Sequence, residues 1–277
     1  MNAPATLAAD GRGRLGARQR STWRTVGLPS EHGGWGLTLE PVLLGLLVAP
    51  SWPGVAIGLV ALAAFLARTP SKLVLVDLVR HRWLPRTTRA ATLAGVEVAM
   101  MLVLAARVVM VAGWALVLPI LLVAPLLLVE LWYDARSRGR RLIPELAGAV
   151  GIAATATAIV VADERSWRLG FALWAVLAGR ALVSIPFIRS QILRLRRGSP
   201  MSSSSMALQG LGVLVAIAAG AVEHSVFVGT IGVVAIAALQ AMSGRRAVPP
   251  PKVLGIRQLA FGLALSTVTA AGVHLVG

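Results

Sequence analysis

One short segment of the chain combines residue types that could do acid/base chemistry or hold a ligand. Residues 29–36 read PSEHGGWG, and Glu40 follows within an apolar stretch. At helical spacing His32, Gly36 and Glu40 share one face of a helix. A carboxyl group inside an apolar stretch is costly unless it is paired or hydrated. Glu40 therefore needs a partner or a cavity.

Two interpretations of this segment are open. In the functional one, Trp35 and Glu40 line a ligand cavity, and Glu31 or His32 is the acid or base of any reaction, because both can titrate. In the structural one, His and Trp form an interfacial belt and Ser30 caps the start of a helix.

Basic residues gather where apolar stretches end. Arg68, Lys72 and Arg80 fall on one helical stripe, and Asp77 lies on the adjoining side. Guanidinium groups are planar donors that suit phosphate or carboxylate recognition. We expect these four residues to bind an anionic ligand, on a helix that runs past the apolar layer.

A deeper cation lies in a later stretch. Arg180 has a turn or more of apolar sequence on both sides, and Arg189 follows it. We expect both to contact the ligand. The alternative for both arginines is a flanking anchor that extends to the lipid head groups. Glu97 is the remaining acid within an apolar stretch, and its pairing with Arg180 is a hypothesis.

One connection between apolar stretches is dense in charge. Within residues 130–145 we expect Tyr133, Arg136 and Arg138 to face the same ligand. The acids of this connection could instead pair with neighbouring arginines. These acids are Glu130, Asp134 and Glu145.

Several kinds of site lack support in the sequence. The chain has no Cys, and its 4 His residues are scattered without ligand spacing. No phosphate-binding glycine loop is present. The sequence therefore predicts no metal and no cofactor. The net charge of +16 is distributed as a membrane topology requires, and no base-reading module is present, so we expect no nucleic-acid partner.

The apolar content of the chain calls for lipid. Apolar residues make up 57% of the chain and the mean hydropathy is +0.78, above what a soluble domain buries. Continuous apolar runs of about the length that crosses a hydrocarbon layer favour helices over a barrel. We predict an all-α integral membrane protein with nine spans, at residues 33–49, 53–67, 90–106, 112–129, 143–162, 167–188, 206–222, 225–242 and 256–276.

The positions of the cations predict the topology. Short cytosolic loops collect Lys and Arg. Most of the 27 Lys and Arg residues lie in the N-terminal tail and in every second connection between the spans. We predict a bacterial plasma-membrane protein with a cytosolic N-terminus and an external C-terminus. Residues 1–28 would form a disordered basic tail, and residues 29–277 one nine-span domain.

The opening motif resembles that of the YwiC-like family of bacterial membrane proteins. The resemblance extends to residues 68–70 (RTP), to Arg180 and to residues 185–189 (IPFIR), and so covers most of the chain. It implies a membrane location without implying a particular reaction.

A more distant similarity is to the UbiA superfamily of intramembrane prenyltransferases. Residues 133–138 (YDARSR) look like the superfamily's fourth-to-fifth loop, where basic residues face a prenyl diphosphate. The resemblance implies a helical bundle with a cytosol-facing cavity. In that superfamily two Asp-rich motifs hold magnesium. Asp77 alone cannot replace them, so the resemblance does not carry over magnesium-dependent prenyl transfer.

Three functions follow from these observations. The first is a UbiA-like scaffold that binds an anionic lipid or isoprenoid ligand through direct hydrogen bonds from its cations. The alternatives are a small anion permease, and a non-catalytic assembly or sensor subunit whose buried charges pair with one another. The lipid bilayer is the expected surrounding in all three.

Overall fold

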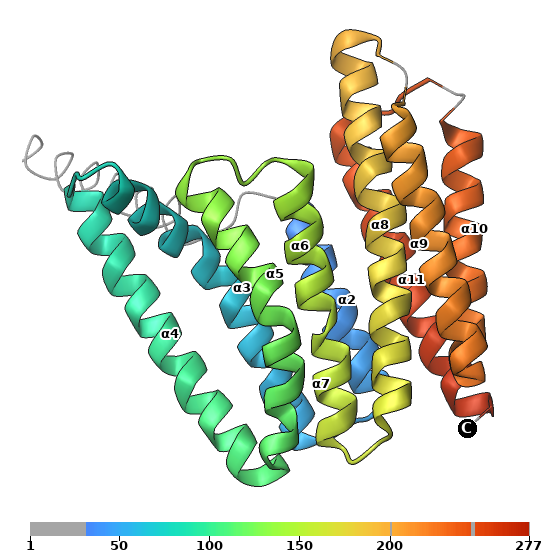
Figure 1. Ribbon diagram of the computed structural model, residues 1–277, viewed down its shortest axis with the longest axis horizontal. Helices are drawn as coiled ribbons and strands as arrows, with labels where there is room; N and C mark the ends of the chain where they lie inside the picture. Colours follow the sequence, from blue (N-terminus) through green and yellow to red (C-terminus); the bar gives the residue numbers. More distant parts are fainter. Residues whose placement is uncertain (1–31, 200, 245–246, 277) are drawn as a thin grey trace, which may run out of the picture.

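The computed structural model of the protein describes residues 32–199, 201–244 and 247–276 (Figure 1). These residues form helices and short connections, and none of them lies in a β-strand. The elements are α2 (His32–Val48), α3 (Trp52–Val79), α4 (Pro85–Ala112), η1 (Trp114–Leu116), α5 (Val117–Ala135), α6 (Leu142–Ala153), α7 (Thr155–Ala162), α8 (Trp167–Arg197), α9 (Ser203–Val222), η2 (His224–Val226), α10 (Phe227–Ser243) and α11 (Pro251–Val276).

Within these described residues, 8 helical segments are long and apolar enough to cross a membrane. Two of them join consecutive elements, since α6 and α7 make up Leu142–Ala162 and η2 and α10 make up His224–Ser243. α2 contributes a shorter apolar helix, Gly34–Val48, at the place of the first predicted span. The predicted all-α membrane fold is confirmed.

The helices α3 and α8 continue furthest beyond the ends predicted for their spans. α3 runs through the buried Pro70 to Val79, and α8 runs through Pro186 to Arg197. A proline removes one helical hydrogen bond, but neighbouring helices can support the freed backbone groups. The predicted span at residues 143–162 is instead interrupted at Ala154, where α6 ends and α7 begins.

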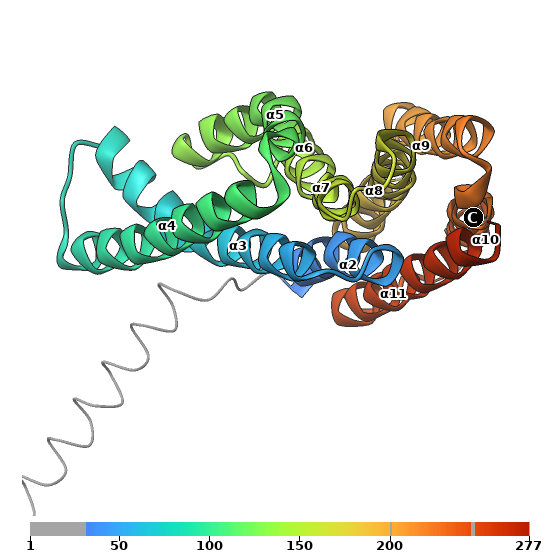
Figure 2. The ribbon, with the colours of Figure 1, turned by 90° about the horizontal axis from the view of Figure 1, so that it is seen from below.

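α8 is the central helix of the bundle. It contacts α6, α7, α9 and α10, and Figure 2 shows it between α7 and α9. Its buried Leu173, Val176 and Val183 belong to the main apolar core. α8 and α9 approach closely at two glycines, because a Cβ on Gly179 would lie 2.6 Å from the carbonyl oxygen of Gly212.

Four helices follow one another along one face of the bundle, in the order α4, α3, α2 and α11 (Figure 2). α2 packs against both α3 and α11, whereas α4 lies at the edge and packs mainly against α3. α2 therefore connects helices that are far apart in the sequence.

The connections alternate between the two ends of the bundle (Figure 1). Those between α3 and α4, α5 and α6, α8 and α9, and α10 and α11 lie at one end. We call it the basic end, because Arg82, Arg138, Arg197 and Lys252 lie in or beside these connections. This arrangement agrees with the charge pattern of the sequence. The side of the membrane that the basic end faces remains a prediction, and the predicted tail at residues 1–28 lies outside the described residues.

Candidate functional site

Two buried charged side chains form an ion pair between α2 and α8. Arg180 Nη2 lies 2.9 Å from Glu40 Oε1, with side-chain exposures of 2% and 3%. Arg180 Nη2 also donates to the backbone carbonyl of Gln258 on α11, at 2.6 Å. The backbone carbonyl of Glu40 accepts from the hydroxyl of Ser266, again on α11. Three helices thus meet around one buried pair of charges.

This pair corrects the hypothesis that Arg180 pairs with Glu97. Glu97 lies on α4, which packs mainly against α3, while Arg180 lies on α8. A buried guanidinium needs a carboxylate partner, because an unpaired buried charge is strongly destabilising. For Arg180 this partner is Glu40 on α2. Glu97 Oε2 is buried and has no hydrogen-bond partner among the described residues.

A second group of charges joins α3 to α5. Arg68 Nη2 lies 2.8 Å from Glu130 Oε1, and Arg68 Nε lies 3.3 Å from Asp134 Oδ2. Lys72 Nζ lies 2.9 Å from Asp134 Oδ1. The glycine at 148 leaves room for the carboxylate of Glu130, since a Cβ there would lie 2.6 Å from its Oε1. Arg68 and Lys72 therefore face carboxylates of this chain.

Arg189 is held in the same way. Its Nη1 lies 2.8 Å from Glu145 Oε2 and donates to the backbone carbonyl of Arg140, at 2.9 Å. Glu145 lies in the first turn of α6, where a negative charge is favourable. The alternative in which acids of residues 130–145 pair with arginines is therefore the observed one, although the partners come from α3 and α8.

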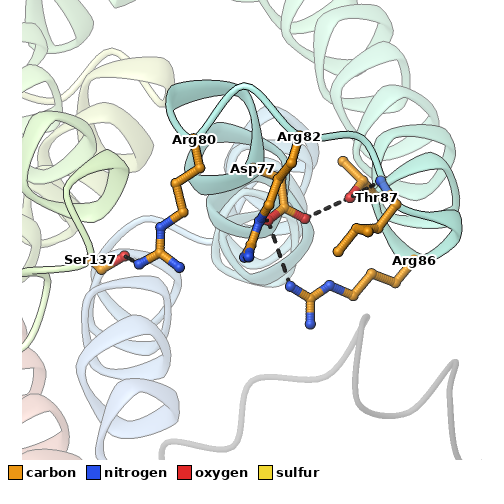
Figure 3. Close-up of polar contacts among 7 residues, drawn as sticks. Asp77, Arg80, Arg82, Arg86, Thr87 and Ser137 are labelled. Carbon is orange, nitrogen blue, oxygen red and sulfur yellow. Dashed lines mark hydrogen bonds and ion pairs between the residues drawn. The ribbon is translucent and has the colours of Figure 1, made fainter.

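Asp77 lies in a compact cluster at the turn between α3 and α4 (Figure 3). Its Oδ2 accepts from the hydroxyl of Thr87 at 2.6 Å, and its Oδ1 lies 2.7 Å from Arg82 Nε and 3.6 Å from Arg86 Nη2. Asp77 is 1% exposed. Its carboxylate is thus occupied by neighbours that hold the turn together, and it does not join the Arg68 group.

Three other predicted residues remain accessible at the basic end. Arg80, Arg136 and Arg138 are exposed, and we call them the arginine patch. Arg80 Nη2 lies 3.3 Å from Ser137 Oγ, as Figure 3 shows, and the guanidinium of Arg136 lies 3.9 Å from the centre of the Trp132 ring. No carboxylate partner is found for these three arginines within the described residues.

The backbone brings the arginine patch together. Arg80 and Arg136 are the residues that follow α3 and α5, and each precedes a residue with positive φ, His81 at 50° and Ser137 at 56°. Both helix ends close with the same pair of backbone hydrogen bonds, the pattern of a Schellman motif. Cations at these positions also face the negative ends of the two helices.

The opening motif is only partly described by the structure. Glu31 lies outside the described residues, and His32 is the first residue of α2. Trp35 packs edge-on against Phe65 of α3, with ring centres 5.0 Å apart. Tyr133 packs edge-on against Trp132 at 4.9 Å. Both predicted ligand aromatics therefore contact other aromatic rings of the chain.

The predicted site residues thus fall into separate groups rather than around one cavity. Within the described residues, no group of three or more His, Cys, Asp or Glu residues could hold a metal ion. A cavity does lie among α8, α10 and α11, and its polar lining was missed in the sequence. The sequence did contain an indication of this polar lining. Three uncharged polar residues lie within or beside apolar spans, namely Gln191, Gln240 and Gln258.

Comparison with known proteins identifies part of the chain. The family described as YwiC-like protein matches residues 28–161. This region includes α2 to α6 and nearly all of α7, but it stops before α8, so it is shorter than the resemblance in the sequence suggested. Glu40 lies inside the matched region and Arg180 outside it. No curated protein and no solved structure matches the chain, and the similarity to the prenyltransferase superfamily stays a prediction. Residues 28–161 of this helical membrane protein are therefore similar to the YwiC-like family.

Proposed function

We propose that this protein binds an anionic amphipathic ligand, a lipid or isoprenoid phosphate, at its basic end through the arginine patch. One observation carries the proposal. Arg68, Lys72, Arg180 and Arg189 contact carboxylates. The three patch arginines are exposed instead; Arg80 contacts a hydroxyl group and Arg136 an aromatic ring. Their charge is therefore available to a ligand.

The geometry favours a phosphate-like head group. Guanidinium groups donate several hydrogen bonds in a fixed plane, which suits phosphate oxygens. Arg80 and Arg136 are placed by helix ends and steadied by Ser137 and Trp132, so less freedom is lost when they bind. This proposal keeps the ligand class inferred from the sequence and narrows the residues that hold its charge.

The surroundings favour a ligand with an apolar tail. Leu128, Leu131 and Trp132 lie on the same helix end as Arg136 and are exposed large apolar side chains. Leu78 and Val79 are similarly exposed beside Arg80. In a bilayer such side chains face the lipid tails, so a ligand can place its head on the patch and its tail along α3 and α5.

Native mass spectrometry of the purified protein in phosphatidylcholine nanodiscs tests the proposal. Phosphatidic acid and an isoprenoid monophosphate are titrated separately, which distinguishes the two sources of phosphate. In the triple variant Arg80→Gln, Arg136→Gln, Arg138→Gln, occupancy should fall at least about tenfold, because each lost cation contributes on the order of 1 kcal/mol at an anionic head group.

A matched control removes the same charge elsewhere at the basic end, with Arg196→Gln, Arg197→Gln and Lys252→Gln, all exposed residues. Its occupancy should change little. An equal loss in the control would mean that the surface attracts anions without a site. Unchanged occupancy in the patch variant would rule out the proposed function.

A further inference from the structure

A cavity of about 490 Å³ lies among α8, α10 and α11 and reaches the connection between α10 and α11. We call it the amide cavity, because three glutamines line it: Gln191, Gln240 and Gln258. Phe187, Leu239 and Phe261 supply apolar walls. Its size lies within the range of roughly 300 to 1,000 Å³ that is common for small-molecule sites.

Two of the glutamines that line the cavity have amide oxygens without a hydrogen-bond partner among the described residues. Gln240 is 1% exposed; its Nε2 donates to Ser184 Oγ at 3.2 Å, and its Oε1 has no hydrogen-bond partner among the described residues. Exchanging the amide nitrogen and oxygen would still leave one of the two unpaired. Gln258 Oε1 is likewise buried and unpaired within the described residues. Such groups are costly in a membrane interior, where water is scarce.

The described lining of the cavity carries little charge. Among the described residues that line it, Arg257 is the one charged residue, and its side chain is exposed. A phosphate inside would lose its hydration without gaining a buried counter-charge. A hydroxyl head group would instead donate a hydrogen bond to the amide oxygens, while an apolar chain would contact the walls.

Another hollow lacks these properties. It measures about 380 Å³ and is lined mostly by apolar side chains of α9 and α10, such as Ile217, Phe227 and Ile231, which are exposed. It offers a lipid tail ordinary apolar contact. The amide cavity differs because its described lining combines buried amide groups, apolar walls and little charge.

We infer that the amide cavity binds an uncharged amphipathic molecule, with a hydroxyl head that donates to the amide oxygens of Gln240 and Gln258 and an apolar chain along Phe187 and Phe261. The Arg180 guanidinium contributes to the position of Gln258, whose backbone carbonyl accepts its hydrogen bond. This site is distinct from the arginine patch, and its ligand does not depend on the proposed function.

The test uses a diacylglycerol and the phosphatidic acid with the same acyl chains, each titrated against the full-length protein in phosphatidylcholine nanodiscs. The wild type should bind the diacylglycerol with saturation. Gln240→Leu and Gln258→Leu remove the amides at similar side-chain size and should weaken diacylglycerol binding about tenfold, as expected for a lost hydrogen bond to a buried group.

Gln209→Leu is the matched control, because Gln209 lies on α9 and donates to the carbonyl of Ser205 outside the cavity. It should leave diacylglycerol binding unchanged, as should the triple variant of the arginine patch. Leu239→Trp supplies a second test if the amide variants fold poorly. It narrows the cavity from a wall residue that is 49% exposed, and it should also weaken binding.

Three results would overturn the inference. One is an absence of saturable diacylglycerol binding by the wild type. Another is unchanged binding in folded amide and Leu239→Trp variants. The third is an equal loss for phosphatidic acid, which would mean that the cavity takes the charged lipid. A loss of phosphatidic acid binding that is confined to the patch variant supports the proposed function. It neither supports nor contradicts the inference about the amide cavity.

Discussion

Arg180 Nη2 and Glu40 Oε1 lie 2.9 Å apart inside the bundle, and this contact joins the region that matches the YwiC-like family to the helices outside it. Arg180→Met or Glu40→Ala leaves the other group buried without its partner. Each variant should destabilise the fold by about 3 to 5 kcal/mol. Thermal unfolding in detergent measures the effect.

The double variant Glu40→Met with Arg180→Met should be more stable than either single variant, because two apolar side chains can replace a buried ion pair at small cost. Additive losses in this double-mutant cycle would show that the two charges do not stabilise one another.

A glycine on α11 makes the position of Glu40 possible. A Cβ on Gly262 would overlap the carboxylate of Glu40, so Gly262→Ala should displace it from Arg180 and lower the unfolding temperature. Gly255→Ala is the control on the same helix, since nothing lies within 4 Å of a Cβ there. It should stabilise the helix by up to about 1 kcal/mol. In the Glu40→Ala background the loss from Gly262→Ala should disappear; its persistence would place the clash elsewhere.

The turn between α3 and α4 depends on Asp77. Asp77→Ala releases Arg82 and Arg86 and leaves Thr87 without its acceptor. We expect trypsin to cleave after these arginines several-fold faster in inverted membrane vesicles. Asp163→Ala, which removes the partner of an exposed Arg165 at the other end, should leave that rate unchanged. Cleavage only in right-side-out vesicles would contradict the predicted cytosolic basic end.

Three described non-glycine residues hold left-handed backbone angles at helix ends, Ser137 and two whose replacement is informative, His81 with φ 50° and Glu164 with φ 58°. Glycine adopts this conformation without a steric penalty. His81→Gly and Glu164→Gly should each stabilise the fold by about 1 kcal/mol, a rise of roughly 2 to 4 °C in unfolding temperature. Gly198→Ala, at φ 67° with open space around it, should have the opposite effect. A decrease on substituting either residue by glycine would mean that its side chain contributes more than the backbone strain removes.

Much of the fold was predictable from the sequence, because lipid imposes a simple rule on apolar content. Runs such as residues 206–222 and 225–242 correspond closely to α9 and to η2 with α10. The ends of α3 and α8 were less predictable, since Pro70 and Pro186 lie within helices that continue. A proline signals a lost hydrogen bond, but neighbouring helices decide whether the helix ends there.

For the candidate site, too, the sequence determined some features and the packing of the helices determined the others. The sequence alone determined which charges need partners, Glu40 and Arg180 among them, because an apolar stretch cannot solvate an ion. Only the tertiary structure decided that these two meet, that Arg68 and Lys72 lie on Glu130 and Asp134, and that Arg80, Arg136 and Arg138 stay accessible. Helical periodicity assigns a residue to a face, whereas the identity of its neighbour depends on how distant helices pack.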